Sequence, residues 1–214
     1  MKKLLDSKER TIEIIKRLKK GYPDAKIALE FSSPMENLVA TILSAQCTDQ
    51  TVNKVTMPLF KKYRTVKAYA NADIKEFEKD IHSTGFYHNK AKNIINAAKM
   101  VLEKFGGKIP DNMQDLISLP GVARKTANVV LGNSFGKTEG IVVDTHVIRL
   151  SQRLGFSKNK DAVKIEQDLI DIVPKTEWLL FSNLIINHGR KICSARKPDC
   201  EKCILDNICP KIGI

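Results

Sequence analysis

The sequence predicts an all-α protein. Apolar residues recur at helical spacing in successive segments, capping residues precede these segments, and hardly any stretch alternates apolar and polar residues as a strand would. The linkers are short, and neither a repeat nor a low-complexity stretch is present. With 214 residues, of which 43% are hydrophobic, the chain is long enough for one large or two small domains with proper cores.

The first half of the chain contains five predicted helices, each placed by its caps. Asp6, followed three residues later by a glutamate, starts a helix that ends before Pro23. Ser33 starts the second helix, with proline in the first turn and Glu36 reaching back to the cap. Because this helix is apolar nearly all round, it is expected to be central. The other three begin at Asp49, at Asp73 and at Asn89, and the last ends at Phe105 before Gly106-Gly107.

The second half contains five further predicted helices. They span residues 111–118, 124–135, 146–154, 161–172 and 176–188. The first two of these are joined by the tight turn Leu119-Pro120-Gly121-Val122-Ala123. Because the first N–H groups of a helix point outward, such a turn is either an anion site for a DNA phosphate or an ordinary helix connection. The turn taken by itself favours the ordinary connection.

Four cysteines near the C-terminal end predict a metal centre. Cys193, Cys200, Cys203 and Cys209 lie within 17 residues, too short a span for two independent metal knuckles. One centre with four thiolate ligands fits best, and we expect a [4Fe-4S] cluster. Zinc is the alternative, although zinc sites more often present two C-x-x-C pairs, and a pair of disulfides is the third interpretation. Cys47 stands apart in an apolar segment and is predicted to be a small buried hydrophobic residue.

The charge of the chain indicates a polyanionic partner. There are 36 Lys and Arg against 24 Asp and Glu, giving a net charge of +12. Nucleic acid is the first candidate, and simple solubility is the alternative explanation. No apolar run approaches the ~20 residues of a spanning helix, so no membrane role is expected. The segment Met1–Leu5 does not resemble a signal peptide, which predicts an intracellular protein, cytoplasmic or associated with the nucleoid.

An ordered set of segments carries a family resemblance. It comprises residues 119–128 and 143–147, the four C-terminal cysteines, and the shorter segments 43–46, 48–49, 85–87 and 89–91. Over essentially the whole chain this set resembles the helix-hairpin-helix DNA glycosylases, most closely their endonuclease III branch. The resemblance implies a six-helix barrel domain over residues 25–136, a cluster domain made of residues 1–24 and 137–214, and an active cleft between them. It also implies a monomer that binds double-stranded DNA with damaged bases or abasic sites.

The same resemblance implies a bifunctional DNA glycosylase and AP lyase of base excision repair that removes oxidised pyrimidines. Lys125 stands at the place of the family's nucleophile, whose amine attacks C1′, expels the base and forms a Schiff base that permits β-elimination. The attack needs a neutral amine, so a lysine pKa lowered by desolvation or neighbouring cations is expected. Asp144 matches the catalytic aspartate and is also placed to cap the following helix. By themselves, a lysine on a helix is ordinarily a solvated charge, and His146 has at most a role in the pocket.

Six further residues are implied to contact DNA. Gln46 and Phe86 fall where the family fills the base stack vacated by the extruded nucleotide, and the alternatives are a buried polar cap for Gln46 and core packing for Phe86. In the hairpin, the family's second glycine is replaced by an alanine, which adds a methyl group near the backbone approach to phosphate. Between the first two cysteines lies a basic segment expected to meet phosphates, unless it is a solvated tail. The hairpin and basic-segment residues are Gly121, Ala123, Arg196 and Lys197.

Two other functions fit parts of the sequence. Adenine or mismatch glycosylases of the same family share the cluster and the aspartate, but they generally lack a lysine where Lys125 stands. Adenine-specific members also continue into a further domain. A non-catalytic DNA-binding or scaffold protein with a zinc site is the alternative outside the enzymes, and in it Lys125 and Asp144 would be incidental.

Overall fold

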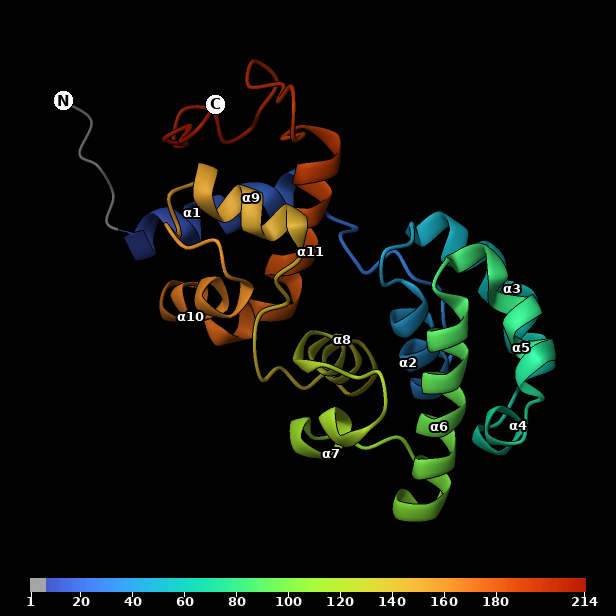
Figure 1. The fold of residues 1–214 in the computed structure, drawn as a ribbon. Helices are drawn as coiled ribbons and strands as arrows, with labels where there is room; N and C mark the ends of the chain where they lie inside the picture. Colours follow the sequence, from blue (N-terminus) through green and yellow to red (C-terminus); the bar gives the residue numbers. More distant parts are fainter. Residues whose placement is uncertain (1–6) are drawn as a thin grey trace. The chain divides into compact units, whose positions relative to one another are not determined.

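The computed structural model describes residues 7–214, and every regular element in that range is a helix (Figure 1). The all-α prediction is confirmed, while the predicted Asp6 cap and the segment Met1–Leu5 lie outside the described residues. Within that range no helix is both long and apolar enough to cross a membrane. In chain order the helices are α1 (Ser7–Gly21), α2 (Pro34–Leu43), α3 (Asp49–Lys62), α4 (Val66–Ala70), α5 (Ile74–Ile81), η1 (His82–Thr84), α6 (Tyr87–Phe105), α7 (Met113–Ser118), α8 (Arg124–Phe135), α9 (Thr145–Arg153), α10 (Ala162–Ile172), η2 (Lys175–Glu177) and α11 (Trp178–Lys191).

The chain folds as two compact units. One is Ile27–Glu139, and the other combines Met1–Lys26 with Gly140–Ile214. Buried apolar side chains form a separate cluster within each unit, so each has a hydrophobic core of its own. The four cysteines and Asp144 belong to the second unit, whereas Lys125 belongs to the first.

Helix α2 is the centre of the unit Ile27–Glu139, as its sequence predicts. Eight of its ten residues are buried, and it packs against α8, α3 and α6. The hydroxyl of Ser33 accepts a hydrogen bond from the N–H of Glu36, which confirms the predicted cap. Glu36 does reach back, but its carboxylate accepts from the N–H and the hydroxyl of Ser32 rather than from the cap residue. The capping box is therefore shifted by one residue.

Two predicted helix starts are wrong by one or two residues. Helix α3 is capped by Thr48 and not by Asp49, because the threonine hydroxyl accepts the N–H three residues further on. Helix α7 is capped in the same way by Asn112. Asp111, where the sequence starts this helix, instead pairs with Lys137 at 2.6 Å. When two capping residues are adjacent in sequence, the one whose side chain reaches the third helical N–H sets the start.

Other differences concern short elements and helix ends. Helices α4, η1 and η2 have five residues or fewer, too few to show an apolar period, and they are not predicted. Helix α6 starts at Tyr87, two residues before the predicted Asn89, and follows Phe86 in the left-handed conformation. Helix α11 starts at Trp178 and extends beyond His188 to Lys191.

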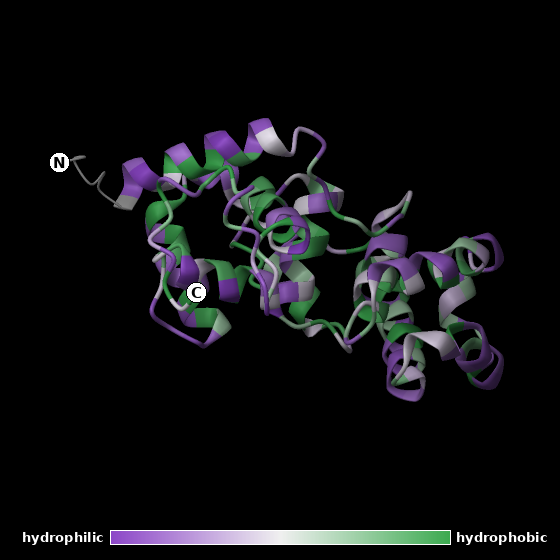
Figure 2. Ribbon diagram, turned by 90° about the horizontal axis from the view of Figure 1, so that it is seen from above, coloured by the Kyte–Doolittle hydropathy of each residue, from purple (hydrophilic) through white to green (hydrophobic). Residues whose placement is uncertain are grey.

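The second unit packs α9 and α11 against each other, with α1 and α10 beside them. Figure 2 shows α1 with hydrophobic residues along the side that faces its unit and hydrophilic residues along the opposite side. Its Ile14 and Leu18 are fully buried, as are Val147 of α9 and Leu184 of α11. This core fixes the start of α9, where Asp144 stands, and the end of α11, from which the chain continues to the four cysteines.

Candidate active site and metal centre

Lys125 is the second residue of α8, a helix that begins at Arg124 as predicted. Its side chain is exposed. A nucleophilic lysine is expected to be desolvated, but the described residues of this unit do not bury the Lys125 side chain. An exposed amine in the first turn of a helix is instead accessible to an incoming ligand, and a bound ligand would itself remove water from the amine.

The hairpin before α8 requires glycine at one position and not at the other. Gly121 has a φ of +77°, and a Cβ built on it would lie 2.8 Å from Cβ of Asn93. Both the backbone conformation and the space therefore exclude a side chain there. Ala123 has a φ of −90°, a region open to any residue, so its methyl group causes no backbone strain. Ala123 caps α8 without a side-chain hydrogen bond.

Asp144 is the N-cap of α9, which confirms the predicted cap. Its Oδ1 accepts hydrogen bonds from the N–H groups of His146 and Val147, both at 2.8 Å. The carboxylate is half-buried and held in one orientation by these two bonds. Arg149, on the same helix, lies 3.1 Å from Nδ1 of His146, and burial lowers the pKa of its guanidinium while Cys193 and Asp144 oppose that shift.

Gln46 and Phe86 both stand exposed in strained turns. Gln46 has a φ of +54° and Phe86 has a φ of +49°. Both values lie in the left-handed region, a backbone conformation that residues other than glycine rarely adopt. Such a conformation costs about 1–3 kcal/mol at each position. Phe86 is 64% exposed, so core packing does not account for it, and the exposed Gln46 is no buried polar cap. Both alternatives weighed from the sequence are therefore wrong.

Lys90 is a buried residue of this unit that the sequence interpretation missed. Its side chain is only 5% exposed, and its Nζ donates to the carbonyls of Leu43 and Thr84, both at 2.8 Å. Burial lowers the pKa of this amine, with a smaller opposing effect from Cys47. A lysine in a helix suggests a surface position, but Lys90 lies four residues before the buried Ile94, on the apolar stripe of α6. That register is the signal that could have revealed it.

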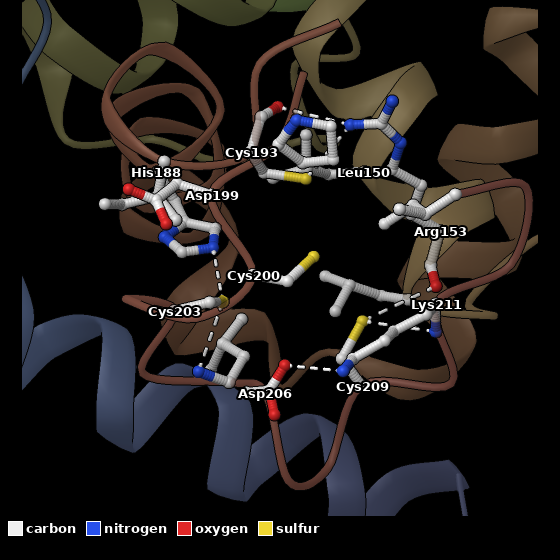
Figure 3. A pocket seen from close by; sticks show the side chains of 15 residues that line it. Leu150, Arg153, His188, Cys193, Asp199, Cys200, Cys203, Asp206, Cys209 and Lys211 are labelled. Carbon is white, nitrogen blue, oxygen red and sulfur yellow. Dashed lines mark hydrogen bonds and ion pairs between the residues drawn. The ribbon is translucent and has the colours of Figure 1, made fainter. Parts of the chain in front are cut away.

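The four C-terminal cysteines line one pocket and come from the segment that follows α11 (Figure 3). Their sulfur atoms face a shared space, bordered by Arg153 and His188. In the described part of the chain, no group of three or more His, Cys, Asp or Glu side chains is arranged to hold a metal ion. Cys47, far from these four in sequence, is half-buried against the core of the other unit.

The surroundings of the cysteines act on the thiolate form in two opposite ways. Arg153 donates to Sγ of Cys193 at 3.2 Å, and backbone N–H groups donate to Sγ of Cys203 and of Cys209, each at 3.4 Å. Burial raises the pKa of the Cys203 and Cys209 thiols, and the nearby cysteines raise it further. Thiols whose pKa is raised in this way need a cationic centre to become thiolate ligands. By residue type, four cysteines lining one pocket are a donor set that iron–sulfur clusters take.

The basic segment between the first two cysteines is tied to the fold. Arg153 is only 9% exposed and donates to the carbonyls of Ser194 at 2.7 Å and Ala195 at 2.8 Å. Ser194 in turn donates its hydroxyl to the carbonyl of Lys197 at 2.5 Å. Arg196 and Lys197 remain exposed on this fixed loop. No local sequence signal distinguishes Arg153 from the other arginines of the chain, so its role emerges only from the structure.

Known proteins match this chain over residues of both units. Residues 39–175 match the HhH-GPD superfamily of base excision DNA repair proteins. The endonuclease III of Synechocystis sp. is 52% identical over 210 residues, which are 98% of this chain and 96% of that protein. Two solved structures, a non-covalent endonuclease III–DNA complex and a trapped endonuclease III–DNA covalent intermediate, each match with a TM-score of 0.90 and 43% identity.

These two matches cover 95% of this chain and 95% and 96% of the respective structures. At that coverage and similarity, the predicted helix-hairpin-helix glycosylase architecture is confirmed. The match of residues 39–175 to the superfamily and the relative of 52% identity both assign the chain to the same family. The chain belongs to the HhH-GPD superfamily of base excision DNA repair proteins.

Proposed function

We propose that this chain is a bifunctional DNA glycosylase and AP lyase that removes oxidised pyrimidines from duplex DNA during base excision repair. The observation that carries the proposal is the exposed amine of Lys125, in the first turn of α8 directly after the Gly121 hairpin. A chain 43% identical to this one has been trapped in a covalent complex with DNA, and such a complex needs a nucleophile on the protein. In this proposal Ile27–Glu139 is the barrel domain, and the other unit is the cluster domain.

Lys125 acts as the nucleophile. Its amine nitrogen forms a bond to C1′ of the damaged nucleotide while the glycosidic bond breaks, and the base leaves with the bonding electrons and takes up a proton. The nitrogen gives up both of its protons on the way to the imine: one balances the proton that the base takes up, and the other goes to the ring oxygen O4′ as the sugar ring opens, which leaves an imine between Lys125 and C1′. Because the imine acidifies the C2′ protons, loss of one of them expels the 3′ phosphate and cuts the strand.

Asp144 supports the first of these steps. Positive charge develops on the sugar as the base leaves, and a carboxylate held in a fixed orientation stabilises that charge without reorganising. The two cap bonds to the N–H groups of His146 and Val147 supply this fixed orientation.

Residues outside this chemistry would also contact DNA. Gln46 and Phe86 would fill the gap that the extruded nucleotide leaves, because both are exposed in turns where the backbone φ is positive. The backbone of the hairpin at Gly121 and Ala123 would hold a phosphate. Arg196 and Lys197 would contact phosphates through charge and not through base edges, so they add affinity without sequence preference.

The four cysteines would hold a [4Fe-4S] cluster. When bound, such a cluster cross-links Cys193, Cys200, Cys203 and Cys209 and fixes the fold of the segment that carries them. Arg153 holds the first turn of this segment through the carbonyls of Ser194 and Ala195, so the basic residues are presented to DNA on a rigid loop. The role assigned to the cysteines is structural.

The experiment that tests the function is borohydride trapping on duplex DNA that carries an oxidised thymine. Reduction of the imine gives a stable covalent adduct. With borohydride, wild type should therefore form the adduct, and without borohydride it should cut the strand. Lys125→Gln should form neither product yet bind the DNA, whereas Lys92→Gln, which removes an exposed lysine from α6, should behave as wild type. An adduct formed by Lys125→Gln, with the crosslink on another lysine, would contradict the assignment.

The same assay separates the two alternatives. A monofunctional adenine or mismatch glycosylase removes a base but gives no trapped adduct. A non-catalytic DNA-binding protein with a zinc site binds the duplex and gives no product at all, and it contains zinc in place of iron.

A further inference from the structure

The buried amine of Lys90 joins two segments that are far apart in sequence. Its two hydrogen bonds, both of 2.8 Å, end on the carbonyl of Leu43, the last residue of α2, and on the carbonyl of Thr84, the last residue of η1. Leu43 is fully buried and Thr84 is 2% exposed. Without the amine, both carbonyls would lose a donor in a place that water does not reach.

Each of these carbonyls lies just before a strained turn. Gln46 follows Leu43 by three residues, and Phe86 follows Thr84 by two. Both residues have a positive φ, although neither is glycine. A strained conformation persists only where the surrounding structure fixes it from several sides. The Lys90 amine bonds to the chain before both turns and so ties the two turns to one buried group.

We propose that Lys90 is a positioning residue that holds Gln46 and Phe86 together in the conformation in which they enter the DNA base stack. The proposal rests on the function proposed above for the chain. An extruded nucleotide leaves a gap, and side chains already fixed at the edge of the gap fill it at a smaller entropic cost than mobile ones. Lys90 touches neither DNA nor the reacting atoms in this scheme and acts only through the two turns.

The test uses the full-length protein and two duplexes. In one, an oxidised thymine is paired with adenine, and in the other the same base stands opposite an abasic spacer, so that no base pair has to be opened. Lys90→Met keeps the length of the side chain and removes the donor. We expect it to slow single-turnover base removal from the paired duplex by about 10- to 100-fold, as a displaced positioning group does. On the spacer duplex the loss should be less than about threefold, since extrusion is easiest where no pair is present.

The matched control is Lys92→Met, which removes an exposed lysine from the same helix and should leave both rates unchanged. A second measurement places Lys90→Met in a Phe86→Ala background. If Lys90 acts through the turn, the double variant should be no slower on the paired duplex than the slower single variant, whereas independent effects would multiply. Fluorescence of 2-aminopurine next to the oxidised thymine reports stacking directly, and its rise on binding should be smaller for Lys90→Met than for Lys92→Met.

Equal slowing of both duplexes by Lys90→Met would show that Lys90 only stabilises the fold, and would overturn the proposal. So would rates equal to those of Lys92→Met. If circular dichroism shows that Lys90→Met does not form its helices, Lys90→Gln takes its place, because the glutamine amide still donates a hydrogen bond. Base removal from the paired duplex should again be the reaction that is slowed. If wild type leaves the oxidised thymine in both duplexes, the proposed function itself is refuted. This outcome is distinct from one in which wild type is active and only the positioning role of Lys90 fails.

Discussion

Asp144 accepts a hydrogen bond of 2.8 Å from the N–H of Val147 with Oδ1, the same oxygen that accepts the N–H of His146. One oxygen of the carboxylate thus satisfies two helix N–H groups at the start of α9. The structural role of Asp144 needs an acceptor atom, whereas the catalytic role proposed for it needs a negative charge. These two requirements are separable by mutation.

Asp144→Asn should retain the cap and lose the chemistry. The amide keeps an oxygen at the position of Oδ1, so the thermal stability should change by less than about 0.5 kcal/mol, since Asn and Asp are equally good caps. Base removal should slow by about 100-fold or more because a neutral amide does not stabilise developing positive charge. Asp144→Ala should lose the charge and in addition about 1 kcal/mol of stability. Equal activity of wild type and Asp144→Asn in single-turnover assays would exclude the charge from the mechanism.

Gly121→Ala should damage the hairpin more than an ordinary glycine substitution does. The new methyl group meets Cβ of Asn93 at 2.8 Å in addition to the strain of a positive φ. We expect a loss of about 1–3 kcal/mol in stability together with weaker DNA binding. Gly136→Ala, at the other end of α8, is the matched control: its φ is +64°, but nothing lies within 4 Å of the new methyl group. Melting temperatures of the two variants should therefore differ, and equal values would mean that Asn93 simply moves aside.

Much of this fold follows from local sequence signals. The caps Ser33, Asp73, Asp144 and Asp161 all accept the helix N–H groups expected of them, because a capping bond reaches only two or three residues. Elements of five residues or fewer were missed because an apolar period needs more than one turn to show.

Residues that act over long sequence separations were not predictable. Lys90 bonds to a carbonyl 47 residues away, and Arg153 to carbonyls 41 and 42 residues away. The register of α6 indicates that Lys90 is buried, but a single sequence contains no signal for its bonding partners or for those of Arg153. The exposure of Phe86 is the reverse case. An aromatic residue within a helical protein suggests core packing. The Phe86 side chain instead points into solvent from its strained turn.

Anaerobically purified protein should be brown and contain about four irons per chain, the content of one cubane cluster. Cys203→Ser should lower the iron content, because it replaces a thiolate ligand by a harder and less acidic hydroxyl. The exposed loop at Arg196 should then become susceptible to proteolysis. Iron and zinc measured on the same samples check both statements. Stoichiometric zinc without iron, after expression with iron supplied, would contradict the cluster.

Arg196 and Lys197 should contribute non-specific affinity. When both are changed to glutamine, binding to damaged and undamaged duplexes should weaken by the same factor. The slope of log K against log salt should become shallower by about two, one unit for each lost phosphate contact. Fluorescence anisotropy over a salt series measures the slope, and Lys158→Gln with Lys160→Gln, a basic pair outside the cysteine segment, serves as the control. A slope equal to that of wild type would place the loop away from DNA.

Lys90 should make part of the protein's stability depend on alkaline pH. Burial lowers the pKa of its amine below the ordinary 10.5, while Cys47 has a smaller opposite effect. Between the lowered pKa and 10.5, the unfolded chain binds a proton that the folded chain does not, so stability rises with pH in that window. Lys90→Met lacks this titration. The difference in melting temperature between wild type and Lys90→Met should therefore shift in favour of wild type as the pH rises toward 10.5. Lys92→Met, which removes an exposed lysine from the same helix, should show no such shift, and a pH-independent difference for Lys90→Met would mean that the buried amine titrates as it does in the unfolded chain.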